Sequence, residues 1–214
     1  MGSLITVTGC VGGIGTSTFA YALGLAARPA VVIEGVASGA PLDLLVGAEQ
    51  APGVRWGQVR IRSDAFNVGE VRRALVQWQG VSLLAADREG VMDPLAAQLL
   101  VEALRRDGIV VLELPYRHPL RDSLRPDLDL VLLPPTLPGI AALALARRPH
   151  SRPIVVDIGT ADLTQRQLVE VLQCEPPRLR WQRSVRLACT AGAALPASSD
   201  PMRVAERELT AVAA

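Results

Sequence analysis

The sequence predicts one α/β domain spanning residues 1–214, in which a mostly parallel sheet is covered by helices on both faces. Half of the 214 residues are apolar and the mean hydropathy is +0.29, which suits a single large core. Short runs of Val, Ile and Leu have the composition of strands that are buried on both faces. These runs alternate with helical segments of about 10 to 15 residues, which is the pattern of βαβ units.

The predicted strands are short apolar runs. They cover residues 4–7, 30–33, 81–85, 109–112, 128–133, 154–156 and, as an edge strand, 179–181. Residues 53–61 alternate weakly between apolar and polar side chains, which indicates an additional strand or extended segment.

The predicted helices show apolar spacings of three and four residues. They cover residues 17–27, 42–46, 68–78, 93–106, 138–147, 164–173 and 201–212. Asp93 before Pro94 is a favourable N-cap followed by a proline in the first turn, and Thr164 is a second N-cap. The last helix is weakly amphipathic with small apolar residues, so we expect it to dock onto the domain rather than onto a membrane.

Charge and composition exclude several classes of function. The formal net charge is +1 and the basic residues form no run, so the chain lacks the electrostatic footprint of a nucleic-acid-binding protein. No apolar run reaches the roughly 18 residues that cross a bilayer, and no signal peptide is expected at the N-terminus. Cys10, Cys174 and Cys189 are scattered, which indicates reduced thiols in a cytoplasmic protein.

A glycine-rich turn, TGCVGGIGTST at residues 8–18, lies between the first predicted strand and the first predicted helix. In a parallel sheet this arrangement presents backbone N–H groups and the positive end of a helix to phosphate oxygens. A P-loop also carries a lysine directly after its last glycine, but here Thr16 follows Gly15. All 22 basic residues are arginine, so no lysine elsewhere in the chain can substitute. The predicted cofactor-binding residues are Gly12, Gly13, Ile14, Gly15, Thr16, Ser17 and Thr18.

Two interpretations of this turn are open. With Gly9, Gly13 and Gly15 in a G-x-x-x-G-x-G pattern, it resembles the dinucleotide turn of short-chain dehydrogenases, and Glu34 at the end of the second strand is placed to bind an adenosine ribose. Those enzymes also need a tyrosine followed four residues later by a lysine, and the chain has no lysine. Under this interpretation the chain is an NAD(P)-type binding module that does not catalyse the dehydrogenase reaction.

From Cys10 onward, CVGGIGTST resembles the deviant Walker A loop of the ParA/MinD class of P-loop ATPases, G-K-G-G-x-G-K-[ST]-[ST]. Three further stretches, GAPLDLLVG at 39–47, PGVRW at 52–56 and IVVLELP at 109–115, resemble one subgroup of that class. This subgroup comprises the CpaE/TadZ-like and septum-site-determining-like proteins of actinobacteria, often linked to Tad/Flp pilus or secretion loci. Larger members carry a receiver-like domain before the loop, and we expect that domain to be absent here.

The resemblance implies ATPase residues at four positions, three of which are substituted. Thr16 stands in the place of the phosphate-binding lysine, and Val11 in the place of a lysine that reaches a partner's nucleotide. Val36 replaces the aspartate that positions the attacking water. Glu113 keeps a carboxylate for Mg²⁺, with Ser17 as the other predicted metal ligand. The lost lysine at Thr16 alone removes a charge-assisted contact of about 1.5 to 3 kcal/mol.

Resemblance and substitutions together predict a catalytically degenerate ParA/MinD-like protein with no catalytic residue. We expect a cytoplasmic positioning or scaffold factor for Tad/Flp pilus or secretion assembly, or for septum-site regulation, that reaches the membrane or cell pole only through protein partners. By analogy it forms a homodimer near Val11 and Gly39. ATP with Mg²⁺ is expected to bind weakly, and nucleic acid and membranes are not expected to bind. A slow ATP-binding switch or ATPase and the dinucleotide module are the alternatives.

The same residues also have purely structural interpretations. Gly12, Gly13 and Gly15 suit a tight turn between strand and helix. Glu34 and Glu113 suit carboxylates that cap helix N-termini at the edge of the sheet. Other prominent side chains are expected to be packing anchors (Trp56, Trp78 and Trp181), a solvated helix face (Arg117, Arg121 and Arg125) or solvated loop histidines (His118 and His150).

Overall fold

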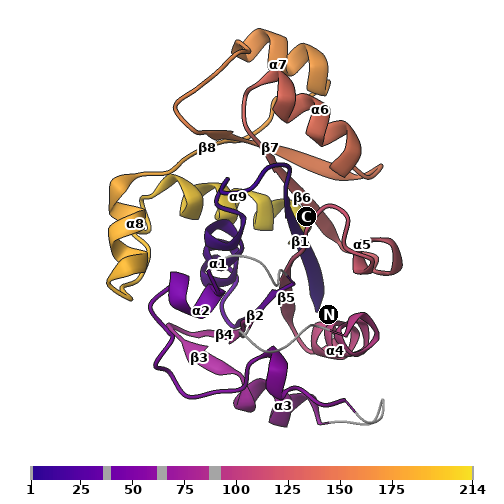
Figure 1. Ribbon diagram of the computed structural model, residues 1–214, viewed down its shortest axis with the longest axis vertical. Coiled ribbons are helices and arrows are strands. Elements are labelled where there is room, and N and C mark those ends of the chain that lie inside the picture. Colours follow the sequence, from indigo (N-terminus) through magenta and orange to yellow (C-terminus); the bar gives the residue numbers. More distant parts are fainter. Residues whose placement is uncertain (1, 36–39, 62–66, 87–92, 214) are drawn as a thin grey trace.

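The computed structural model describes residues 2–35, 40–61, 67–86 and 93–213. Within them the chain forms one eight-stranded sheet with the order β3-β4-β2-β5-β1-β6-β7-β8 (Figure 1). The pairing of β3 with β4 is antiparallel and the other ladders are parallel. This confirms the predicted fold class. The strands are β1 (Ser3–Gly9), β2 (Ala30–Glu34), β3 (Val76–Trp78), β4 (Val81–Leu84), β5 (Ile109–Glu113), β6 (Leu128–Leu133), β7 (Ser151–Asp157) and β8 (Arg178–Arg180).

The described helices connect these strands and cover the sheet. They are α1 (Thr16–Ala26), α2 (Leu42–Leu45), α3 (Val68–Ala74), α4 (Pro94–Arg106), α5 (Leu120–Ser123), α6 (Leu137–Ala146), α7 (Gln165–Leu172), α8 (Arg183–Thr190) and α9 (Asp200–Ala213), with a 3₁₀ turn η1 (Trp56–Gln58). Asp93 and Thr164 are N-caps, as predicted. None of these helices combines the length and the apolar character needed to cross a bilayer.

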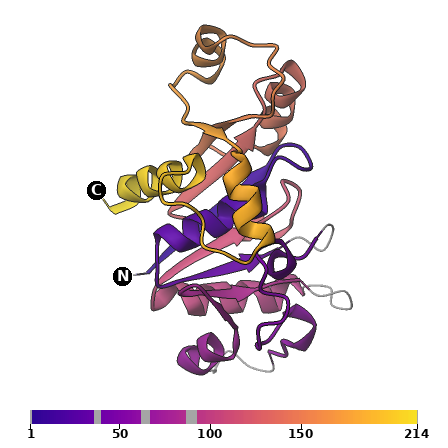
Figure 2. The same cartoon turned by 90° about the vertical axis from the view of Figure 1, so that its left-hand side faces the viewer.

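Alternation along the strands divides the core into two layers. On β6, Leu130 and Leu132 point to the layer of α1, α8 and α9, whereas Val131 and Leu133 point to the layer of α6 and α7. Helices α4 and α5 pack on that second side against β1, β2 and β5. Figures 1 and 2 show the sheet between these two helical layers.

Helix α1 is enclosed on every side. Residues 19–25 are all buried, and Gly24 lies so close to β2 that a Cβ there would come within 2.3 Å of Val32. Helix α9 covers α1 with Met202 and Ala205, which are buried in the same core. This packing confirms that the C-terminal helix docks onto the domain, and it fixes the N-terminus of α1 above the end of β1.

The predicted helix 68–78 is wrong in its last part. Helix α3 ends at Ala74, and the following residues form β3, an edge strand antiparallel to β4. Gln79 and Gly80 both have positive φ (51° and 84°), so they form a two-residue hairpin turn of the primed type. Val76 faces the core on this strand and is fully buried.

The extended segment predicted at 53–61 is a short 3₁₀ turn in its centre. Buried Trp56 lies in η1 and donates its indole N–H to the carbonyl oxygen of Glu34 at 2.7 Å. Val54 makes one isolated bridge to Leu75. The Trp56 side chain, rather than a β ladder, therefore holds residues 53–61 against β2.

Helix α8 is missing from the sequence prediction. It begins after Gln182, which is not one of the preferred N-cap residues and whose side chain forms no cap hydrogen bond. The sequence therefore gives no N-cap signal for the start of this helix. Val185 and Cys189 face the core from this helix.

Arg121 does not belong to a solvated helix face. It is only 4% exposed and donates to the buried carboxylate of Asp129 at 3.2 Å. Arg148, Ser151 and Thr6 donate to the same carboxylate. Burial alone would raise the pKa of Asp129, but these hydrogen bonds outweigh it and hold the pKa below its usual value.

Candidate phosphate-binding site

The loop of residues 10–15 takes a conformation that requires glycine. Gly13 and Gly15 have φ of 73° and 93°, in the left-handed region. Gly15 is also the N-cap of α1, so the first backbone N–H groups of the helix have no side-chain cap. A Cβ at Gly12 or Gly13 would meet nothing within 4 Å, whereas one at Gly15 would lie 2.3 Å from the Trp181 ring. The loop is therefore open at Gly12 and Gly13 and tightly packed at Gly15.

Trp181 holds the loop from the end of β8. Its half-buried indole packs on Gly15 and donates its N–H to the carbonyl oxygen of Ile14 at 2.8 Å. The structure confirms the prediction that Trp181 is a packing anchor. The sequence did not indicate that the loop is what it packs against. The loop at the start of the chain thus depends on a residue about 170 positions later.

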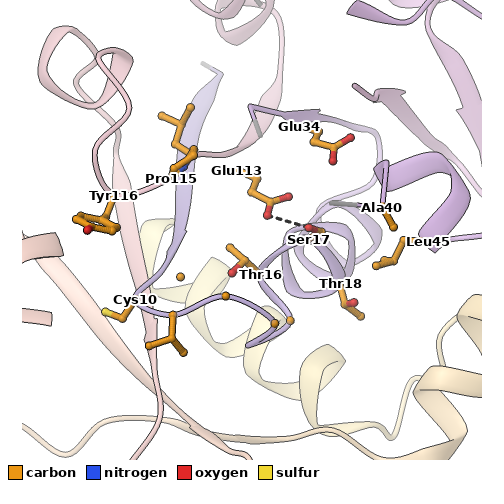
Figure 3. A pocket seen from close by; sticks show the side chains of 16 residues that line it. Cys10, Thr16, Ser17, Thr18, Glu34, Ala40, Leu45, Glu113, Pro115 and Tyr116 are labelled. Carbon is orange, nitrogen blue, oxygen red and sulfur yellow. Dashed lines mark hydrogen bonds between the residues drawn. The ribbon is translucent and has the colours of Figure 1, made fainter. Parts of the chain in front are cut away.

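A pocket of about 580 Å³ lies between this loop and the carboxyl ends of β2 and β5 (Figure 3). The loop lines one side, and Glu34, Ala40, Leu45, Glu113 and residues 114–116 line the rest. No described residue of this lining is basic, whereas two are glutamates. The pocket is therefore acidic.

Glu113 and Ser17 form the polar centre of the pocket. The Ser17 hydroxyl donates to Oε1 of Glu113 at 2.8 Å, drawn as a dashed line in Figure 3. Oε2 of Glu113 is buried and has no hydrogen-bond partner among the described residues. Burial raises the pKa of Glu113 to about 7, the Ser17 hydrogen bond partly opposes this rise, and the charge of Glu34 adds to it.

Glu34 lies beside Glu113 because the two residues are register partners on β2 and β5. Its Oε2 accepts the backbone N–H groups of Leu42 at 2.9 Å and Ala86 at 2.8 Å. Burial raises the pKa of Glu34, and these two hydrogen bonds oppose the rise. Glu34 therefore caps the first residue of α2, as the structural interpretation expected. Glu113 instead bonds a side chain in the first turn of α1.

The donor set fits a hard divalent cation better than it fits a bare triphosphate. A serine hydroxyl and a carboxylate with a free oxygen are ligands that Mg²⁺ takes. The open space around Gly12 and Gly13 allows phosphate oxygens to approach the loop backbone. The described lining contains no cation that would balance the charge of those oxygens. Ser17 and Glu113 would hold the metal, which would supply that positive charge when bound.

Six of the seven predicted cofactor-binding residues line the pocket, and Ile14 does not. The Ile14 side chain is 2% exposed and belongs to the core, so only the Ile14 backbone is left to contact a cofactor, and its role in cofactor binding stays a prediction. Sequence reasoning did not name Cys10 as a lining residue although it begins the loop, and it missed Tyr116 because no spacing rule connects Tyr116 to the loop. Val36 and Gly39, which the resemblance placed near the site, lie outside the described residues.

A glycine loop between β1 and α1, facing an acidic residue at the end of the neighbouring β5, defines a P-loop type of nucleotide-binding fold. Comparison with solved structures narrows the class. A ParA family ATPase from Chlorobium tepidum TLS superimposes with a TM-score of 0.77 at 11% identity, covering 96% of each chain. A chain of the MinC:MinD cell division complex of Aquifex aeolicus gives 0.69 at 22% identity, covering 97% of this chain and 96% of that one. The chain therefore has the fold of the ParA and MinD ATPases.

Sequence comparison gives two relatives in Mycobacterium tuberculosis, both described as uncharacterized. Each is 38% identical to this chain over 130 residues, which is 60% of the chain and 37% of the relative. The chain thus spans well under half the length of these relatives. No family model matches it.

Proposed function

We propose that this protein is a ParA/MinD-like positioning or scaffold factor that does not hydrolyse nucleotide and acts through protein contacts. The observation that supports this proposal best is the acidic pocket, in which two buried glutamates face the phosphate loop without a basic residue in the described lining. A triphosphate with bound magnesium is still negatively charged. Negative charge also develops during phosphoryl transfer, and the described lining offers no cation to stabilise it, so the transition state is disfavoured as well as binding.

The partners proposed for this factor are components of a Tad/Flp pilus or secretion machine, or of the septum-site machinery. The MinD chain whose fold it shares is part of a MinC:MinD cell division complex. That likeness supports a protein partner, and the sequence resemblance of residues 39–56 and 109–115 supports the pilus and septum classes. A homodimer is part of the proposal.

A slow ATP-binding switch or ATPase is the second candidate, because one observation favours it. The Ser17 hydroxyl already contacts Glu113, and the free Oε2 of Glu113 leaves an oxygen for a metal. The dinucleotide module has less support. Dinucleotide-binding folds place the first strand beside the second, whereas here β5 lies between β1 and β2.

Titration calorimetry with ATP and Mg²⁺ tests the proposal through Thr16. Wild type is expected to bind with a Kd of about 1 mM or weaker. Thr16→Lys supplies the missing cation in a loop that is otherwise shaped for phosphate, so it should tighten binding about ten- to a hundredfold. Thr210→Lys adds the same charge on an exposed part of α9 and should change nothing.

Three results would count against the proposal. Micromolar binding by wild type would favour the switch. If Thr16→Lys binds no better than Thr210→Lys, the loop does not present its amides to phosphate. A thermal melt that NADH shifts and ATP does not would favour the dinucleotide module.

A further inference from the structure

Helix α6 is apolar all round although one side of it faces solvent. Its ten residues, LPGIAALALA, include no polar side chain. Gly139, Leu143 and Ala146 face the sheet, with Gly139 so close to Pro134 that a Cβ would come within 2.4 Å of its carbonyl oxygen. Leu137 and Leu145 on the outer side are 65% and 70% exposed.

The outer face of α6 contrasts with that of its neighbour α7. The exposed residues of α7 are mostly polar, namely Gln165, Arg166, Gln167 and Glu170, together with Val169 and Val171. The exposed residues of α6 are Leu137, Pro138, Ala141, Ala144 and Leu145, which we name the α6 face. Figures 1 and 2 show α6 on the outside of the molecule, at the end opposite α3. A helix that is apolar on every side is normally covered.

The α6 face is symmetric about Ala141. Its positions are 137, 138, 141, 144 and 145, so reversing the helix about position 141 exchanges 137 with 145 and 138 with 144. Two antiparallel copies would therefore place Leu137 against Leu145 at both ends and alanine against alanine at the centre. Small central residues allow two helices to approach closely, and a self-complementary patch is what a twofold interface requires.

The charges at the two ends of α6 are complementary in the same way. The Asp162 carboxylate lies at the N-terminal end, where Oδ2 accepts the N–H of Leu137 at 3.3 Å. Exposed Arg147 is the C-cap at the other end, and within the described part of the chain no ion pair engages it. Antiparallel pairing brings Asp162 of each copy to Arg147 of the other.

We propose that the α6 face binds the α6 face of a second copy of this chain, antiparallel and about a twofold axis through Ala141. At the alternative face, the half-buried Val11 side chain packs on the chain's own core. A ten-residue helix is about 15 Å long, so this interface is smaller than that of a permanent dimer and pairing is expected to be weak, with a Kd of about 10 µM or weaker. This proposal does not depend on whether nucleotide binds.

Analytical ultracentrifugation across this concentration range tests the pairing. Wild type is expected to pass from monomer to dimer, and Leu145→Glu to weaken the dimer more than tenfold by burying a charge in an apolar contact. Leu44→Glu, at an exposed leucine of α2, and Val11→Glu are the matched controls and should leave the dimer unchanged. Thermal unfolding of each variant checks that the fold is intact.

A charge exchange tests the antiparallel geometry itself. Asp162→Arg alone and Arg147→Asp alone should each weaken the dimer about three- to tenfold, because each sets like charges opposite one another. The double variant should restore the wild-type Kd. In a Cys174→Ser background, Ala141→Cys should cross-link to itself and Thr190→Cys should not, because only Ala141 lies on the axis.

Three results would overturn the proposal. The first is a chain that stays monomeric at every concentration. The second is a dimer that Val11→Glu breaks and Leu145→Glu does not, which would assign pairing to the loop. The third is a monomer that floats with anionic vesicles and loses this binding with Leu145→Glu, which would assign the α6 face to lipid.

Discussion

Glu113 is the residue whose chemistry departs furthest from that of an exposed glutamate. It is 4% exposed, one carboxylate oxygen accepts the Ser17 hydroxyl, and the other has no partner in the described structure. Burial raises its pKa to about 7, so near neutral pH a large share of the molecules carry an uncharged Glu113. A cation that binds Glu113 must displace this proton, and its affinity should therefore rise with pH.

Glu113→Gln should make the protein more stable at alkaline pH. The folded pKa of about 7 lies above the ordinary value of 4.5, so wild type loses stability as the pH rises from about 4.5 to about 7. A shift of this size corresponds to about 3 kcal/mol. The glutamine side chain would keep an acceptor for Ser17 and remove the penalty. Urea unfolding at pH 8 should show the gain, and at about pH 4, below both pKa values, the two proteins should be equal.

Glu170→Gln, at an exposed position of α7, is the control for Glu113→Gln and should leave stability unchanged at both pH values. Equal stability of wild type and Glu113→Gln at pH 8 would mean that Glu113 is not buried as described.

Trp181 determines whether the loop keeps its conformation. Trp181→Ala removes the ring from Gly15 and the hydrogen bond to Ile14. Replacing a fully buried aromatic residue by alanine costs about 3 to 5 kcal/mol, and the half-buried Trp181 should cost less than that. Trp181→Phe retains a ring and loses only the hydrogen bond, at a cost of about 1 kcal/mol. Hydrogen exchange at residues 10–16 should accelerate far more in Trp181→Ala than in Trp181→Phe. Equal exchange in both variants would show that the ring does not hold the loop.

At the scale of elements, local sequence signals predicted most helices and strands. They failed where contacts with residues distant in the sequence determine the secondary structure. Asp93 and Thr164 cap α4 and α7 as the sequence indicates, because capping depends on residues only two or three positions apart. The predicted end of α3 was wrong because the residues from Val71 to Trp78 keep helical spacing. In the structure Gln79 and Gly80 form a hairpin turn, and the pairing of β3 with β4 stabilises it. Helix α8 has no cap signal, and its place depends on contacts with the core.

The carboxylate of Asp129 connects four elements and should be essential for stability. It joins β1, α5, β6 and the start of β7 through Thr6, Arg121 and Ser151. Asp129→Asn leaves Arg121 buried without its counter-charge, which costs about 3 to 5 kcal/mol. Asp107→Asn, at the exposed C-cap of α4, is the control. Denaturant unfolding at neutral pH measures both.

The pH dependence of Asp129→Asn follows from the lowered pKa of Asp129. A carboxyl whose folded pKa is below its unfolded value stabilises the fold above the unfolded pKa, and this contribution disappears as the pH falls through the folded pKa. The gap between wild type and Asp129→Asn should therefore narrow in acid. A gap that stays constant down to low pH would contradict the ion pair.

At the scale of the whole molecule, the sheet order brings the parts of the site together. Because β5 lies between β1 and β2, the Gly loop after β1, Glu113 at the end of β5 and Glu34 at the end of β2 meet at one edge of the sheet. From the motif resemblance, the sequence predicted that Ser17 and Glu113 act together, but it predicted neither the strand order nor the place of Glu34 beside Glu113. It missed the Trp181 contact and the buried Arg121, because nothing in local spacing indicates a partner across the sheet.

The central claim is that a loop with phosphate-binding architecture faces an acidic pocket and therefore supports no turnover. Release of inorganic phosphate from ATP by the purified chain, with Mg²⁺ in excess and at pH 8 where Glu113 is charged, tests it most directly. We predict a rate for wild type equal to that of Glu113→Ala and to buffer alone. Magnesium-dependent release that Glu113→Ala abolishes would contradict the account.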